Sequence, residues 1–240
     1  MTTAYQLIQA GNSQDLARLA AKTIADCISS ALAQRERSQV TLSGGTTPAI
    51  AYRLLSQEHL PWDRVDLFLS DERWVEPENE ASNSLMLRRT LLRPGTPGSY
   101  ATFYPVPTIK LLSASASAEA FAKLIMQACS GKPPVFDLVI LGLGEDGHTA
   151  SLFPGTDALS VCSSWTAVSY GKGLDRITMT MPVLSAARQV IFLVSGTSKR
   201  RALERLLSPD ESLRCIPAKL VQPHNTVLIL ADEAAAGKLG

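Results

Sequence analysis

The sequence predicts an α/β fold in which a single doubly wound, mostly parallel sheet carries helices on both faces. Two short apolar runs have the composition of buried strands: FDLVILGLG (136–144) and QVIFLVSG (189–196). The last predicted strand is NTVLILAD (225–232). Other segments show the 3.6-residue apolar period of amphipathic helices. Strands that alternate with such helices are typical of Rossmann-like sheets. No linker divides the 240 residues, so we expect 1–240 to form one domain.

The same alternation continues along the rest of the chain. Helices are predicted at 13–36, 47–57, 82–93, 115–131 and 197–208, and further strands at 39–45 and 64–70. Ser13 is the expected N-cap of the first helix, and Pro48 suits the first position of the second. Pro94 and Gly131 stop the third and fourth helices. The segment RITMTMPVLSAA (176–187) alternates like a strand and then turns helical.

Composition and charge exclude several classes of protein. The 23 basic and 22 acidic residues nearly cancel, without the basic excess of a nucleic-acid-binding protein. The most apolar run, at 136–144, is far too short to span a bilayer, and the N-terminal segment lacks the features of a secretory signal. We therefore expect no nucleic-acid partner and no membrane. A cytoplasmic monomer or weak homodimer is the expected form.

The cysteines point to the same compartment. They form no CxxC pair, and no histidine lies at metal-ligand spacing from them. Reduced thiols in a cytosolic protein explain all four, at positions 27, 129, 162 and 215. The sequence therefore predicts no metal site.

Polar and glycine-rich segments directly follow four of the predicted strands, whose own residues are almost all apolar. These segments are SGGTTP (43–48), DER (71–73), EDGH (145–148) and SGTSK (195–199). Open α/β sheets bind their ligands beyond the carboxyl ends of the strands. The clustering therefore predicts a polar ligand site at this edge of the sheet.

Two of these segments have features of an anion site. In SGGTTP, Gly44 and Gly45 let the backbone approach a ligand, Thr46 and Thr47 supply hydroxyls, and the next helix directs free N–H groups at the loop. A tight turn with a threonine cap explains that loop equally well. In SGTSK, Lys199 falls in the first helical turn, where the helix dipole disfavours a cation. A bound anion would explain a lysine there, and a solvated surface lysine is the alternative.

The DER segment adds charged groups at another strand end. Arg73 has the planar fork that suits phosphate or carboxylate, and Asp71 and Glu72 are further candidates beside it. A solvated loop is the ordinary explanation of such a run. Its position after a buried strand favours a role in the site.

The segment LGLGEDGHTASLFPG (141–155) contains the GxGxxG spacing of a dinucleotide-binding loop. Such a loop opens a long helix and is followed about 20 residues later by an acidic residue at a strand end. Here proline and glycine close the segment, and no such acidic residue follows. We interpret the glycines instead as the frame of His148, one of three histidines. Asp146 can orient its imidazole and raise its basicity, which makes His148 a candidate general base.

Taken together, the motifs resemble a known enzyme family. LSGGTTP, SDERWV followed by SN at 82–83, LGLGEDGHTASLFPG and RITMTMPVLSAARQVIFLVSGTSK resemble the 6-phosphogluconolactonases, in the same order over roughly residues 40–230. That family belongs to a wider group with the glucosamine-6-phosphate deaminases/isomerases. The deaminases share GEDGH but usually continue with a segment like IAFNEP, and they typically show DEY. TASLFP and DER in this chain favour the lactonase.

The resemblance implies a fold of the sugar-phosphate isomerase type and a carboxylic ester hydrolase without metal or cofactor. The implied reaction is hydrolysis of 6-phospho-D-glucono-1,5-lactone to 6-phospho-D-gluconate in the oxidative pentose phosphate pathway. His148 is implied as the base that activates water, Asp146 as its orienting partner, and Arg73 as a catalytic or orienting group. Implied substrate and phosphate contacts are Gly44, Gly45, Thr46, Thr47, Lys199 and Arg176.

Two other functions stay open from the sequence. The first is an isomerase or deaminase of amino sugar phosphates, in which Asp71 and His148 transfer protons. The second is a sugar-phosphate sensor that binds without turnover. No serine nucleophile is expected, because the chain has no G-x-S-x-G elbow.

Overall fold

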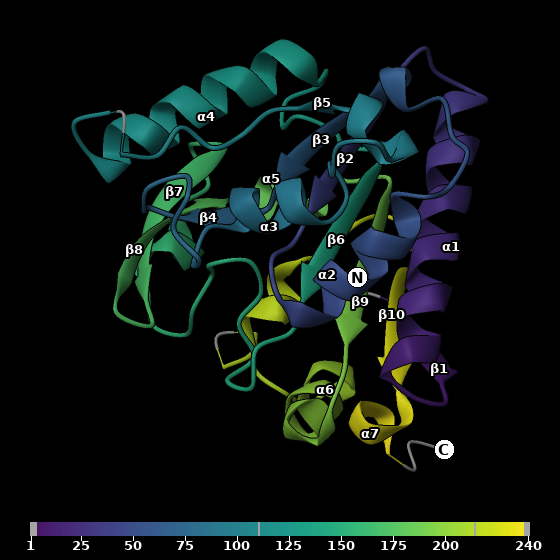
Figure 1. Cartoon of the computed structure of the whole chain (residues 1–240). Helices are drawn as coiled ribbons and strands as arrows, with labels where there is room; N and C mark the ends of the chain where they lie inside the picture. The colour runs from purple at the N-terminus through teal and green to yellow at the C-terminus, as the bar shows by residue number, and fades with distance from the viewer. Residues whose placement is uncertain (1–3, 110, 214, 238–240) are drawn as a thin grey trace.

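The computed structural model describes residues 4–109, 111–213 and 215–237 (Figure 1). Its main element is a sheet of parallel strands in the order β1-β10-β9-β6-β2-β3-β5. The strands are β1 (Tyr5–Ala10), β2 (Ser38–Leu42), β3 (Val65–Leu69), β5 (Thr102–Phe103), β6 (Leu138–Gly142), β9 (Gln189–Val194) and β10 (Val227–Asp232). The predicted doubly wound, mostly parallel sheet is confirmed. The strands predicted to be buried, β6 and β9, have an apolar core in which Val139 and Ile191 have no exposed surface. Ile229 of β10 is equally buried.

The strand order reverses between β2 and β6. From β2 the chain moves outward to β3 and β5, then returns to place β6 on the other side of β2, followed by β9 and β10. The loops that leave β2 and β6 therefore diverge. This divergence opens a crevice at the carboxyl edge of the sheet, where proteins of this class bind ligands.

Helices cover the sheet, and Figure 1 shows α1 and α4 on opposite sides of it. The helices are α1 (Ser13–Leu32), α2 (Thr46–Leu55), α3 (Asn83–Arg89), α4 (Ala114–Ala128), α5 (Met181–Ser185), α6 (Arg200–Leu207) and α7 (Glu233–Ala236). Short 3-10 turns are η1 (Trp62–Arg64), η2 (Pro97–Tyr100), η3 (Asp157–Ser160), η4 (Thr197–Lys199) and η5 (Pro217–Leu220). Within the described ranges, no helix has the length and apolar character to cross a membrane.

The predicted helices are present with corrected ends. Asn12, rather than Ser13, caps α1, because its side-chain oxygen accepts the backbone N–H groups of Gln14 and Asp15 at 2.9 and 3.0 Å. This helix ends at Leu32. In the second helix, Gly45 is the cap and Thr46 the first residue, so Pro48 occupies the third position.

A second, antiparallel sheet was not predicted. It has the order β4-β8-β7, formed by β4 (Asp71–Arg73), β7 (Thr166–Gly171) and β8 (Leu174–Met179). The DER segment is therefore a strand rather than a loop, and Arg73 pairs with Arg176 across the ladder. A strand of this length cannot show an alternating pattern, so the sequence gives no signal for it. The small sheet joins two charged segments that are distant in the chain.

Candidate active site

A cleft of about 230 Å³ lies at the carboxyl ends of β2, β6 and β9, where the strand order reverses. Nine of the predicted residues line it: Gly44, Gly45, Thr46, Thr47, Asp71, Arg73, His148, Arg176 and Lys199. Two predicted residues do not. Asp146 contacts His148 from outside the lining, and Glu72 is buried inside the protein. Among the described residues, no group of three or more His, Cys, Asp or Glu side chains is placed to hold a metal ion.

Gly144 and Gly147 allow the loop 144–148 to fold tightly around His148. The N–H of Gly144 donates to the carbonyl of His148 at 2.8 Å, and that of Gly147 donates to the carbonyl of Gly144 at 2.9 Å. A Cβ at Gly144 would lie 2.0 Å from Nδ1 of His148, and Gly147 has a φ of +85°. Larger residues would therefore displace the imidazole. The glycine spacing serves the histidine, as the interpretation of this loop predicts.

The imidazole of His148 is paired with a carboxylate. Its Nδ1 lies 2.5 Å from Oδ1 of Asp146, which also accepts the backbone N–H of His148 at 3.1 Å. Burial lowers the pKa of His148 below its ordinary value, against the opposing effect of Asp146. Burial raises the pKa of Asp146, but the hydrogen bonds from His148 outweigh it and hold that pKa low. A neutral imidazole that donates from Nδ1 to Asp146 carries its lone pair on Nε2.

Arg73 is held in place by Asn83, a residue that sequence reasoning left without a role. Nη1 of Arg73 donates to Oδ1 of Asn83 at 2.5 Å and to the carbonyl of Ala81 at 2.7 Å. Asn83 in turn donates to the carbonyl of Asp71 at 2.8 Å. Nε of Arg73 is buried and has no protein partner among the described residues. A ligand in the cleft can supply the missing acceptor.

Glu72 is buried and holds the backbone around Arg73 and Asn83 in place. Its carboxylate accepts the backbone N–H groups of Asn83 and Ser84, each at 2.7 Å, and that of Arg73 at 2.9 Å. Burial raises the pKa of Glu72 in spite of these hydrogen bonds. The carboxylate thus holds the start of α3 against β4, and it is not among the residues that face the cleft.

Asp71 and Arg176 form a buried pair on the cleft wall. Oδ2 of Asp71 accepts the hydroxyl of Ser151 at 2.5 Å and lies 3.6 Å from Nη1 of Arg176. Nε of Arg176 donates to the carbonyl of Gly171 at 3.1 Å. Burial lowers the pKa of Arg176 and Asp71 counteracts it. The guanidinium is therefore fixed in orientation before any ligand binds.

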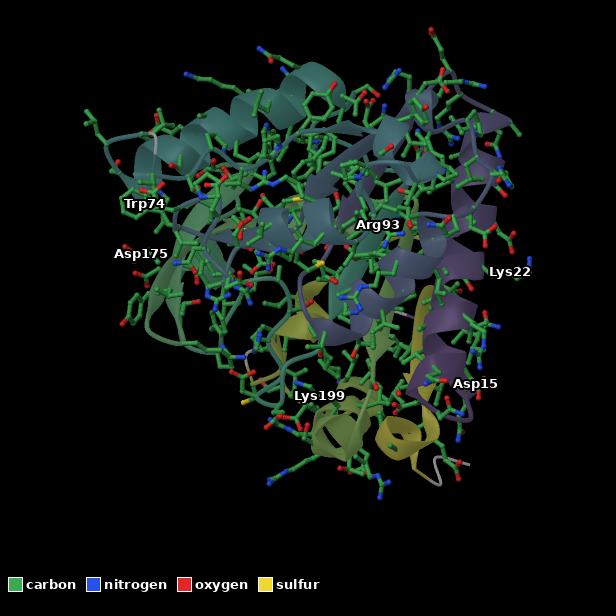
Figure 2. All side chains as sticks on the ribbon, in the orientation of Figure 1. Asp15, Lys22, Trp74, Arg93, Asp175 and Lys199 are labelled. Atoms are coloured by element: carbon green, nitrogen blue, oxygen red, sulfur yellow. The ribbon has the colours of Figure 1, made fainter. Side chains whose placement is uncertain are left out.

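The other end of the cleft has the features of an anion site. Gly45, with a φ of +117°, caps α2, and the first residues of that helix, Thr46 and Thr47, line the cleft. The first N–H groups of a helix have no partner within it and suit an anion. Lys199 lies in η4, just before α6 (Figure 2). Its Nζ is 3.9 Å from Oε1 of Glu145. Glu145 therefore contacts the site at its rim.

The lining also includes Ser43, which lies in the predicted SGGTTP segment, and Lys172, for which the sequence predicted no role. The hydroxyl of Ser43 is buried without a protein partner among the described residues. Lys172 forms the tip of the β7–β8 hairpin with a φ of +55° and faces the cleft. The sequence signal for Lys172 is its position between two glycines, which is typical of a tight hairpin turn. Ser43 begins SGGTTP, a segment predicted to reach the ligand site, and the structure adds that its hydroxyl is buried there.

Comparison with known proteins gives a consistent picture. The family model described as glucosamine-6-phosphate isomerases/6-phosphogluconolactonase matches residues 11–230. The chain is 37% identical over 236 residues to a 6-phosphogluconolactonase of Synechocystis sp., which covers 95% of both chains. It is 38% identical over 237 residues to the human 6-phosphogluconolactonase, covering 92% of this chain and 87% of that protein.

Solved structures share the architecture. The 6-phosphogluconolactonase of Trypanosoma brucei superposes with a TM-score of 0.87 at 26% identity, over 100% of both chains. A monomeric glucosamine-6-phosphate deaminase has a TM-score of 0.79 at 20% identity, over 97% of this chain and 98% of that one. The second likeness is one of fold.

Proposed function

The chain belongs to the family of glucosamine-6-phosphate isomerases and 6-phosphogluconolactonases, and we propose that it hydrolyses 6-phospho-D-glucono-1,5-lactone to 6-phospho-D-gluconate. Relatives that carry the name 6-phosphogluconolactonase match almost the whole chain. The observation that carries the mechanism is the contact of 2.5 Å between Nδ1 of His148 and Asp146, at a cleft whose far end has the features of an anion site.

His148 acts as the general base in this mechanism. Nε2 takes a proton from a water molecule as the water oxygen attacks the lactone carbonyl carbon, and Asp146 stabilises the imidazolium that forms. The tetrahedral intermediate then collapses with cleavage of the bond to the ring oxygen, which takes the proton from Nε2. The product acid ionises in solution. A base of this kind contributes roughly 10²–10⁴-fold to the rate.

The two arginines stabilise negative charge on the carbonyl oxygen. Arg176 is fixed by Asp71 and Gly171, and Arg73 by Asn83 and Ala81. Cations that are oriented before the reaction need no reorganisation as charge develops in the transition state. The unpaired Nε of Arg73 gives it a free donor for this purpose.

The phosphate of the substrate serves as a handle at the other end. Backbone N–H groups and hydroxyls from Gly45 to Thr47, together with Lys199, receive it at this end of the cleft. Binding energy from this remote group holds the lactone carbonyl near His148, which lowers the entropic part of the barrier.

Asp71 argues against the deaminase alternative. A proton-transfer role needs a carboxylate oxygen that is free to face the substrate. Both oxygens of Asp71 have partners in the wall, Ser70 and Ser151, and Arg176 lies beside them.

The test is a lactone-opening assay, corrected for spontaneous hydrolysis, with the wild type, His148→Ala and the control His224→Ala. His224 is exposed and outside the cleft lining. We expect His148→Ala to lower kcat by roughly 10²–10⁴-fold with little change in affinity for 6-phosphogluconate. Ammonia release from glucosamine-6-phosphate without lactone hydrolysis would contradict the proposal. Ligand binding without turnover in the wild type would support the sensor instead.

We further propose that residues 1–240 act as one domain, in the cytoplasm, as a monomer or weak homodimer without cofactor. One family model extends over 11–230 without interruption, which supports a single domain. The near balance of charge supports a small-molecule substrate rather than a nucleic acid.

A further inference from the structure

The ring of Phe153 contacts both the imidazole of His148 and the guanidinium of Arg176. The ring centroids of His148 and Phe153 are 4.4 Å apart, with an angle of 37° between the planes. Cζ of Arg176 lies 5.4 Å from the Phe153 centroid, in the range of a cation–π contact. Phe153 is 6% exposed. One apolar side chain thus touches the proposed base and one of the two proposed oxyanion cations.

The space for this ring is created by a glycine on another strand. A Cβ at Gly171, the last residue of β7, would lie 2.3 Å from Cε2 of Phe153. The backbone on either side of the ring is also tied down. The hydroxyl of Thr156 donates to the carbonyl of Phe153 at 2.8 Å, and Thr149 forms an isolated β-bridge with Leu152. The ring therefore has a fixed position.

Resting on the proposed function, we propose that Phe153 is a positioning residue. Its ring sets the orientation of the His148 imidazole and the Arg176 guanidinium toward the cleft and keeps water away from one side of the imidazole. Gly171 is part of the same device, because it leaves room for the ring and also accepts the Nε hydrogen of Arg176.

The charged groups around His148 give this arrangement a measurable consequence. Asp146, at 2.5 Å, and Asp71 favour the imidazolium, whereas Lys172 and burial favour the neutral imidazole. Arg176 is a further cation in contact with the same Phe153 ring. Removal of the ring admits water to the imidazole and leaves the contact with Asp146 in place. The balance then moves toward the imidazolium, so the pKa of His148 rises.

NMR can measure this directly, because the chain has three histidines. In a His59→Gln/His224→Gln background the remaining imidazole signal belongs to His148. We compare its titration in the parent, in Phe153→Leu and in Phe153→Ala. The matched control is Phe121→Leu, since Phe121 is fully buried on α4 and lies outside the cleft lining.

Both Phe153 variants are expected to raise the pKa of His148 by about 0.5–1 unit, with the larger shift in Phe153→Ala. The acid limb of the kcat/KM profile, which reports the free enzyme, should move by the same amount, and Phe121→Leu should move neither. An unchanged His148 titration in a folded Phe153→Leu protein overturns the proposal, and this variant decides the matter if Phe153→Ala does not fold. Because the titration needs no turnover, a failure of the lactonase assay leaves this test intact.

Discussion

Gly44→Ala is expected to disrupt Arg73, a residue that it does not contact directly. A Cβ at position 44 would lie 1.9 Å from Oδ1 of Asn83, where ordinary contact begins at 3.4 Å. The amide must therefore retreat by about 1.5 Å. Asn83 holds Arg73 at 2.5 Å and the Asp71 carbonyl at 2.8 Å, and these two hydrogen bonds cannot both survive such a shift.

The size of the effect follows from these two bonds. A hydrogen bond to a charged group contributes roughly 1.5–3 kcal/mol and a neutral one roughly 0.5–1.5 kcal/mol. We expect Gly44→Ala to lower the free energy of unfolding by about 2–4 kcal/mol. If the hydrogen bond from Arg73 to Asn83 no longer positions the guanidinium in the transition state, its roughly 1.5–3 kcal/mol is lost from transition-state binding. The value of kcat/KM then falls about 10- to 150-fold.

A double-mutant cycle with Asn83→Ala tests the reasoning by urea unfolding and lactone hydrolysis. Once the amide is gone the clash is gone, so Gly44→Ala should cost less than about 0.5 kcal/mol in the Asn83→Ala background. The control for stability is Gly142→Ala, where an added Cβ meets nothing within 4 Å. Additive effects of Gly44→Ala and Asn83→Ala, or a Gly44→Ala protein as stable as Gly142→Ala, would refute the coupling.

Two further predictions concern the base and the phosphate handle. A general base works in its neutral form, so kcat/KM falls as the pH drops through the pKa of His148 in the free enzyme. Burial lowers that pKa below the ordinary 6.5, so we expect half-maximal kcat/KM below pH 6.5. A midpoint above 6.5 would contradict this. Lys199→Gln should raise KM by about tenfold or more with kcat little changed, whereas the exposed Lys22→Gln should alter neither. Initial rates over a range of lactone concentrations separate the two constants, and a loss confined to kcat would exclude Lys199 as a handle.

The fold could be predicted where strands are buried on both faces. Runs such as 138–142 and 189–194 are continuously apolar, and α1 shows a full helical stripe, so local pattern and tertiary burial agree. The strands β1 and β7 have mixed burial and no such run, and β4 is too short to carry a period. Their pairing is decided by partners elsewhere in the chain.

The candidate site shows the same division. His148 and Asp146 are two residues apart, so a local glycine-rich motif was enough to pair them. The anchoring of Arg73 by Asn83, and the contact of Phe153 with both His148 and Arg176, bring together separate segments of the chain. Side chains such as these have ordinary core or surface identities in the sequence, and their roles follow from contacts.

By itself the sequence determined the class of sheet, the strand ends that carry the chemistry and the family to which the chain belongs, because each of these depends on residues that are close together in the chain. The tertiary structure alone decided that β4 joins a second sheet, that Glu72 is internal, and which partners fix each arginine. These features depend on pairing between segments that are far apart, and the free energy of such pairing comes from close packing and desolvation that local residue patterns do not encode.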